Sequence, residues 1–155
     1  MSVALEAINI LLDEPTLRDI NIARSIISKS PYTFVIVKKG NIIFTSRKEQ
    51  IVSIISAIED MKDSIEGSVV GCNMVGKAAA FLYRFSKTKG VYSVKGTKTG
   101  IALLIMSGIP CQIDEMIPKV VSDVDRRMCP FEDVINGSES SEEVYEIIKN
   151  KLKVG

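Results

Sequence analysis

Apolar residues recur along the chain with two different spacings, which predict a series of helices and strands. Residues 2–14 carry apolar side chains three and four positions apart, as an amphipathic helix does. Pro15 interrupts this pattern, and Thr16 is a candidate cap for a second helix that ends at Ser30–Pro31. The two segments form either two helices or one broken helix.

Residues 32–47 carry the clearest strand pattern. Two runs rich in β-branched and aromatic residues, TFVIV and NIIFTS, flank Lys39–Gly40. Such runs around a short glycine turn predict two antiparallel strands. Residues 48–65 then have isoleucines at helical spacing, and Glu66–Gly67 is expected to end that helix.

The second half of the chain alternates short apolar runs with helical patterns. The runs predict strands at residues 68–72, 91–94 and 109–114, and helices are expected between them at 75–88 and 101–106. The pattern fades afterwards, so a long connection is expected before the next helix.

That connection is expected to cover residues 115–128. Cys129–Pro130 then begins a small helix with proline at its first position, where the missing N–H is not needed. Ser140 and Glu143 have the spacing of a capping box for the last helix.

This order of elements predicts a three-layer α/β/α domain with a mixed five-stranded sheet covered on both faces. A length of 155 residues suits one domain, so we expect a single domain of residues 1–155 with residues 1–30 as an N-terminal helical segment packed on it. Right-handed crossovers place helix starts, and usually the ligand, at the carboxyl ends of parallel strands.

The composition and net charge of the chain argue against several classes of function. The net charge is +1, so binding to nucleic acid is not expected. No apolar run reaches the roughly 18 residues of a membrane helix. Three cysteines in no paired pattern indicate reduced thiols and a cytoplasmic protein. The chain has no histidine, which removes the side chain used most often as a general base and as a zinc ligand.

The leading candidate for a binding site is the stretch GCNMVGKAAA, because a helix start with glycines, a lysine and small residues suits an anion. Its pattern approaches a P-loop but lacks the Ser/Thr that would hold Mg²⁺. The alternative is that the glycines permit close packing and the lysine extends to solvent. The candidate ligand-binding residues are Gly71, Asn73, Gly76, Lys77, Ala78 and Cys129.

Cys129 stands at a predicted helix start, where the helix dipole lowers the pKa of a thiol and favours a nucleophilic or redox role. Without a histidine to activate it, an inert cysteine is the alternative. Glu132 falls in the first turn of the same helix, where an acid stabilises the dipole. If the protein is an enzyme, Cys129, Lys77 and Glu132 are the candidate catalytic residues.

Three motifs, VGKAAAFLY (75–83), GIP (108–110) and CPFE (129–132), follow the FVIVKKGNIIFTS hairpin in this order. Together they resemble a small uncharacterised prokaryotic family, a domain of unknown function with the cytidine deaminase-like fold. The resemblance covers nearly all of residues 17–150 and implies that fold.

Active zinc deaminases of that fold begin one helix with H-x-E and another with P-C-x-x-C. On that plan Lys77 stands at the histidine position and Ala79 at the glutamate position, while Glu132 replaces the second thiol of the motif that Cys129 begins. Zinc sites need three or four protein ligands. The resemblance therefore implies no metal, no cofactor and no hydrolytic deamination, and it suggests a Lys77–Glu132 ion pair beside Cys129.

The sequence thus favours a zinc-free, deaminase-fold protein that binds a small anionic or nucleotide-like ligand between residues 71–77 and 129–132. Two alternatives stay open. One is an enzyme of different chemistry that uses Cys129 and Lys77. The other is a protein-interaction or assembly module, in which the N-terminal helix and the apolar helix at 101–106 form the face of a homodimer.

Overall fold

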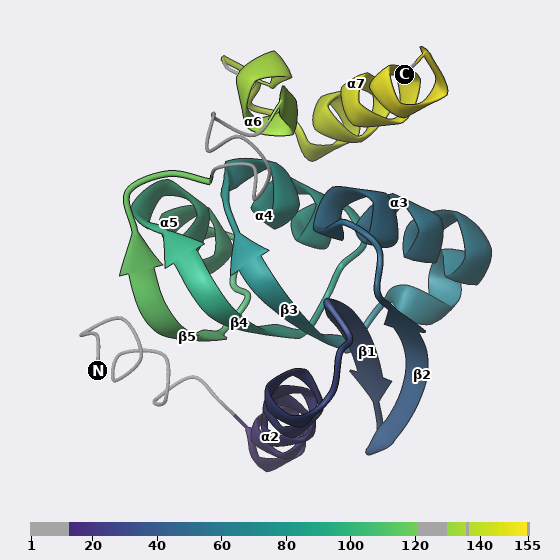
Figure 1. Ribbon diagram of the computed structural model, residues 1–155, viewed down its shortest axis with the longest axis vertical. Helices are drawn as coiled ribbons and strands as arrows, with labels where there is room; N and C mark the ends of the chain where they lie inside the picture. The colour runs from purple at the N-terminus through teal and green to yellow at the C-terminus, as the bar shows by residue number, and fades with distance from the viewer. Residues whose placement is uncertain (1–12, 121–129, 136, 155) are drawn as a thin grey trace.

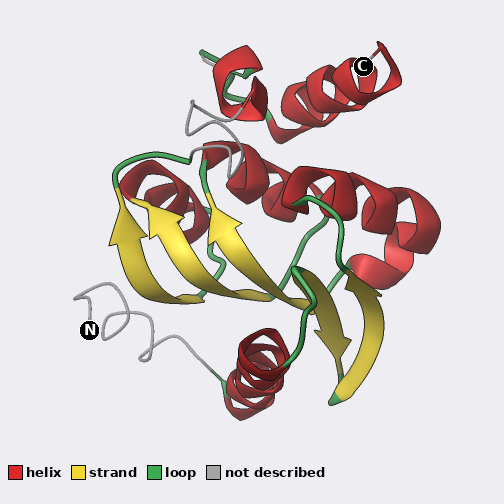
Figure 2. Cartoon of the chain, in the orientation of Figure 1, coloured by secondary structure: helices red, strands yellow, loops and turns green. Residues whose placement is uncertain are grey.

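A mixed five-stranded sheet lies between helices on its two faces in the computed structural model of the chain, as Figures 1 and 2 show. The structure describes residues 13–120, 130–135 and 137–154. The strand order is β2-β1-β3-β4-β5, with β1 antiparallel to both of its neighbours and β3, β4 and β5 parallel. The prediction of three layers with a mixed five-stranded sheet is confirmed. The strands are β1 (Phe34–Lys38), β2 (Asn41–Ser46), β3 (Val69–Val75), β4 (Gly90–Thr97) and β5 (Cys111–Ile117).

Helices of the described part of the chain cover both faces of the sheet (Figure 1). Two further helices lie beyond the second layer, against α4. The helices are α2 (Glu14–Lys29) on the first face, α3 (Gln50–Met61), α4 (Lys77–Phe85) and α5 (Lys98–Met106) on the second, and α6 (Pro130–Val134) and α7 (Ser141–Val154) outside them; a 3₁₀ turn, η1 (Lys62–Ile65), follows α3. None of the helices in these described ranges is long and apolar enough to cross a membrane.

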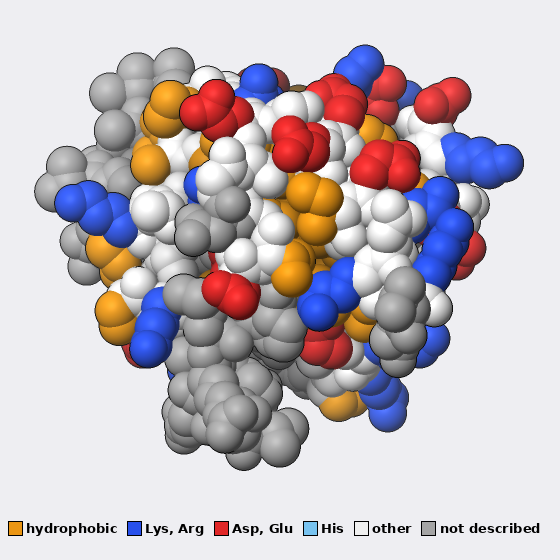
Figure 3. Space-filling model, turned by 90° about the horizontal axis from the view of Figure 1, so that it is seen from above, with side chains coloured by type: hydrophobic (Ala, Val, Ile, Leu, Met, Phe, Trp, Pro, Cys, Tyr) orange, Lys and Arg blue, Asp and Glu red, His pale blue; other side chains and the backbone are white. Residues whose placement is uncertain are grey.

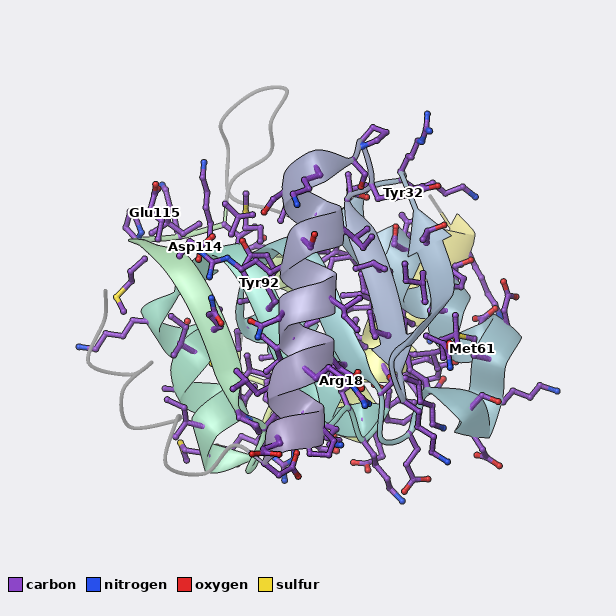
Figure 4. The ribbon with its side chains drawn as sticks, turned by 90° about the horizontal axis from the view of Figure 1, so that it is seen from below. Arg18, Tyr32, Met61, Tyr92, Asp114 and Glu115 are labelled. Atoms are coloured by element: carbon purple, nitrogen blue, oxygen red, sulfur yellow. The ribbon has the colours of Figure 1, made fainter. Side chains whose placement is uncertain are left out.

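The core has two parts because both faces of the sheet are apolar. The larger part packs residues such as Phe34, Ile54 and Leu82 between the sheet and α3, α4 and α5. The smaller part packs Ile20 and Tyr92 between α2 and the other face. In the view of Figure 4, α2 crosses the sheet with Tyr92 and Asp114 on one side of the helix and Arg18 on the other.

The start of α2 differs from the prediction. Asp13 caps the helix, and its side chain accepts a hydrogen bond from the Thr16 N–H at 2.7 Å, so the prediction of a Thr16 cap was wrong. Pro15 lies inside the first turn, where its missing N–H leaves no intrahelical bond unmade. The segment predicted as the first helix falls almost wholly on residues 1–12, which are outside the described residues.

The hairpin prediction is confirmed, with positive φ angles at Lys39 (51°) and Gly40 (81°) in its turn. The Gly40 N–H donates to the buried carboxylate of Asp19 at 2.9 Å, which ties α2 to the hairpin. The Ser140 cap is also confirmed, since its hydroxyl accepts from the Glu143 N–H at 3.3 Å.

Three strands extend further than predicted. β3 and β4 each continue for three residues beyond the predicted end, to Val75 and Thr97, and β5 continues to Ile117. The expected connection at 115–128 therefore begins as strand. Helix α4 is shorter than the predicted 75–88 at both ends, because β3 takes Val75 and the helix ends at Phe85 with Ser86 as its C-cap.

Candidate functional site

The start of α4 lies directly after the carboxyl end of β3. Gly76 is the N-cap and, being a glycine, supplies no side-chain acceptor for the first turn. That acceptor comes instead from α6. The Ala78 N–H lies 3.2 Å from one carboxylate oxygen of Glu132 and 3.3 Å from the other. The structure therefore brings together a helix start and a carboxylate that are 54 positions apart in the sequence.

Position 76 favours glycine because side chains from other parts of the chain lie close to its Cα. A Cβ at this position would overlap Oε1 of Glu132 and would lie 2.5 Å from Cγ2 of Val120. The φ of Gly76 is −115°, an extended conformation that any residue adopts. The space around Cα, and not the backbone conformation, is therefore what demands a glycine.

Helix α5 begins beside the start of α4. A Cβ at Gly100 would lie 2.7 Å from the carbonyl carbon of Gly76. Thr97 caps α5, and its hydroxyl accepts from the Gly100 N–H at 3.0 Å. Two helix starts thus meet at the carboxyl ends of β3 and β4, where the positive ends of both helix dipoles favour an anion.

The N–H groups and the positive charge near the Glu132 carboxyl offset only part of the effect of its burial. Burial raises its pKa, while the N–H groups of Ala78 and Lys77 and the positive charge of Lys77 oppose that rise. Both hydrogen-bond distances exceed the 2.7–2.9 Å typical of charge-assisted bonds. The helix start therefore holds this carboxylate loosely.

Lys77 does not form the ion pair that the sequence suggested. Its Nζ lies over the ring of Phe81, 5.8 Å from the ring centroid. Within the described part of the chain no ion pair joins Lys77 to Glu132. Its charge still acts on Glu132, because it lowers the pKa of that carboxyl.

Gln50 completes the end of β3, and sequence reasoning missed it. β1 begins at Phe34, which pairs with Cys72, so Met74 extends beyond the antiparallel neighbour. The Gln50 carboxamide takes the place of the missing strand: its oxygen accepts from the Met74 N–H at 3.1 Å and its nitrogen donates to the Met74 carbonyl. The same nitrogen lies 3.3 Å from the Tyr83 hydroxyl.

The other candidate residues lie elsewhere or outside the described residues. Gly71 faces α2, since a Cβ there would lie 2.9 Å from Cβ of Ala23. The structure therefore places it in the packing of α2 on the sheet. Asn73 is exposed on β3. Cys129 lies outside the described residues, so its place beside Lys77 and Glu132 stays a prediction.

Among the described residues, no group of three or more Cys, Asp or Glu side chains is placed to hold a metal ion. The start of α4 offers N–H donors and the Lys77 ammonium, which attract anions and repel cations. Charged side chains of both signs are interspersed over the face that carries α6 and α7 (Figure 3).

These features define a three-layer α/β/α protein with an internal carboxylate at a helix start. The chain belongs to the TM1506 family, a domain of unknown function (DUF1893), whose model matches residues 22–152. It is similar to the solved structure of a DUF1893 family protein, TM1506, from Thermotoga maritima. The two chains are 28% identical with a TM-score of 0.77, over 90% of this chain and 92% of that one. The family resemblance drawn from the motifs is confirmed.

Two other solved structures, of Acinetobacter baumannii RibD, are similar over a smaller part. They share 18% and 17% identity with this chain over 64% of its length and 36% and 35% of theirs, both with a TM-score of 0.46. No curated protein matches the chain.

Proposed function

We propose that this protein binds a small anionic or nucleotide-like ligand at the start of α4. The observation that carries the proposal is the carboxylate of Glu132, whose two oxygens lie 3.2 and 3.3 Å from the Ala78 N–H. A site that holds one anion has the donors for another of similar size.

Three features of the site support this proposal. The first-turn N–H groups of α4 have no intrahelical partners and carry the positive end of the dipole. Gly76 leaves space for an oxygen atom against its Cα. Lys77 adds a positive charge, which opposes the rise in the pKa of the Glu132 carboxyl. The proposal includes neither zinc nor hydrolytic deamination.

A thermal-shift screen tests it. Inorganic phosphate, nucleotides, nucleosides and phosphosugars are added to wild type, to Lys77→Ala and to Lys87→Ala, a matched control beyond the opposite end of α4. A ligand at a hundred times its dissociation constant adds about 2.7 kcal/mol, roughly 5–10 °C for a chain of this size. We expect a shift in wild type and Lys87→Ala that is reduced in Lys77→Ala. If no anion shifts wild type at any concentration up to 10 mM (~a hundred times a 0.1 mM constant), the proposal fails.

One observation favours assembly as a second function. Helix α5 is apolar, and it exposes Ile105 and Met106, the latter at 83%. Exposed apolar side chains that adjoin one another are typical of contact surfaces. We expect a homodimer in light scattering that Met106→Ser weakens. A monomeric wild type at high protein concentration would rule this function out.

A further inference from the structure

We propose that Glu132 is an internal competitor for the ligand: its carboxylate occupies the start of α4 until a ligand anion displaces it. This inference rests on the proposed function and adds its regulation. It treats the contact between the Glu132 side chain and α4 as an autoinhibitory contact that opens when ligand binds.

The geometry of the contact supports a competitor. The two oxygens of Glu132 lie 3.2 and 3.3 Å from the Ala78 N–H, which is longer than a good charge-assisted bond. A free phosphate or carboxylate has no chain connection to satisfy, so it can approach the first-turn N–H groups more closely. The overlap between a Cβ at Gly76 and Oε1 of Glu132 also means that the same volume cannot hold both the carboxylate and a ligand oxygen.

The position of Glu132 in the fold also supports displacement. It belongs to α6, a five-residue helix that packs against α4 and α7 and belongs to neither the sheet nor the layer of α3, α4 and α5 (Figure 1). α7 itself is held on α4 by apolar contacts, including the stacked rings of Phe85 and Tyr145. Phe131 and Ile135 pack in the core on either side of Glu132, so α6 stays in place and only the Glu132 side chain has to leave the start of α4.

The charge balance favours exchange. Burial disfavours the ionised form of Glu132, and the Lys77 ammonium, which lies over Phe81, makes no ion pair with it. An incoming anion thus takes the place of the poorly compensated Glu132 carboxylate, which moves into water. The apparent affinity for the ligand is the intrinsic affinity multiplied by the fraction of molecules in which Glu132 has left the site. An internal competitor therefore lowers the apparent affinity.

The test compares the affinity of wild type and variants for inorganic phosphate and for a nucleoside monophosphate by calorimetry. Glu132→Ala removes the competitor, Glu132→Gln keeps its size without its charge, and Asp133→Ala is the matched control one residue away. We expect both Glu132 variants to bind at least about tenfold more tightly than wild type, and Asp133→Ala to bind as wild type does. A tenfold change corresponds to about 1.4 kcal/mol.

Each outcome has one meaning. If wild type binds and the Glu132 variants bind at least about tenfold more tightly, the inference stands. Where all proteins bind with equal affinity, the ligand site is real and Glu132 is only a structural cap, which overturns the inference alone. If none of the proteins binds either anion, the inference and the proposed function both fail. Glu132→Gln keeps the test valid should Glu132→Ala not fold.

Discussion

Replacing Gly76 with alanine perturbs the one point where the start of α4, the loop after β5 and α6 meet. The new Cβ would overlap Oε1 of Glu132 and would lie 2.5 Å from Cγ2 of Val120. Since the φ of Gly76 is −115°, alanine introduces no backbone strain, and the whole cost comes from these contacts. Gly76→Ala therefore tests whether Glu132 occupies the site.

The expected magnitude follows from three contributions. Overpacking costs about 1–3 kcal/mol. Losing the hydrogen bond between Glu132 and Ala78 costs about 1.5–3 kcal/mol if the carboxylate stays buried, and less if it moves to water. Against these, alanine gains about 0.4–1 kcal/mol by restricting the unfolded chain. If the carboxylate stays buried, the free energy of unfolding should fall by about 1.5–5.6 kcal/mol, a loss of roughly 3–20 °C in Tm.

Urea denaturation of a double-mutant cycle measures the part that comes from Glu132. In a Glu132→Ala background the overlapping oxygen is absent, so Gly76→Ala should cost at least about 1 kcal/mol less than in wild type, a coupling within the range of residues in contact. The matched control is Gly71→Ala, whose Cβ would lie 2.9 Å from Cβ of Ala23, in the packing of α2 on the sheet. Its cost should be the same in both backgrounds. Equal costs of Gly76→Ala in the two backgrounds would refute the placement of Glu132.

Three further predictions concern other parts of the account. Gln50→Ala leaves the N–H and carbonyl of Met74 without their partner and should lower the free energy of unfolding by about 1–3 kcal/mol in urea denaturation; a change below 0.5 kcal/mol, at roughly the noise of a surface substitution, contradicts the contact. Burial in the folded state raises the pKa of Glu132 above its ordinary 4.5, so the free energy of unfolding should fall as pH rises from 4.5 through the raised pKa. Glu132→Gln should remove this pH dependence, and a pH dependence that is unchanged in Glu132→Gln would contradict the prediction. Cys72 and Cys111 are both buried, which raises the pKa of each thiol, that of Cys111 to about 12. Any rapid iodoacetamide labelling should therefore be lost in Cys129→Ser, and labelling that persists would exclude Cys129 as the reactive thiol.

The elements that could be predicted from the sequence are those whose signals are local. The hairpin around Lys39–Gly40 follows from β-branched runs on either side of a glycine turn. The Ser140 cap follows from its spacing to Glu143. The strand ends could not be predicted in the same way, because Gly96 and Lys95 are poor strand formers that the parallel pairing with β5 holds in place.

The helix start at Lys77 could be predicted from the sequence, but its contacts with distant residues could not. The start of α4 was identified because glycine, lysine and alanines at a helix start are visible locally. Its contact with Glu132 spans 54 positions, and the Gln50–Met74 contact spans 24, so neither leaves a local signal. Gly71 is the reverse case. The sequence pattern favours space for a ligand beside this glycine, whereas in the structure Ala23 of α2 packs there.

The most direct measurement of the central claim is the amide resonance of Ala78 in a two-dimensional NMR spectrum. In ligand-free protein its proton shift should follow the titration of Glu132 and should not titrate in Glu132→Gln, since the carboxylate accepts from this N–H. Adding inorganic phosphate to wild type at neutral pH should move the Ala78 resonance to a new position that Glu132→Gln reaches at lower phosphate concentration. An Ala78 amide proton shift that changes neither with pH nor on addition of phosphate would contradict the account.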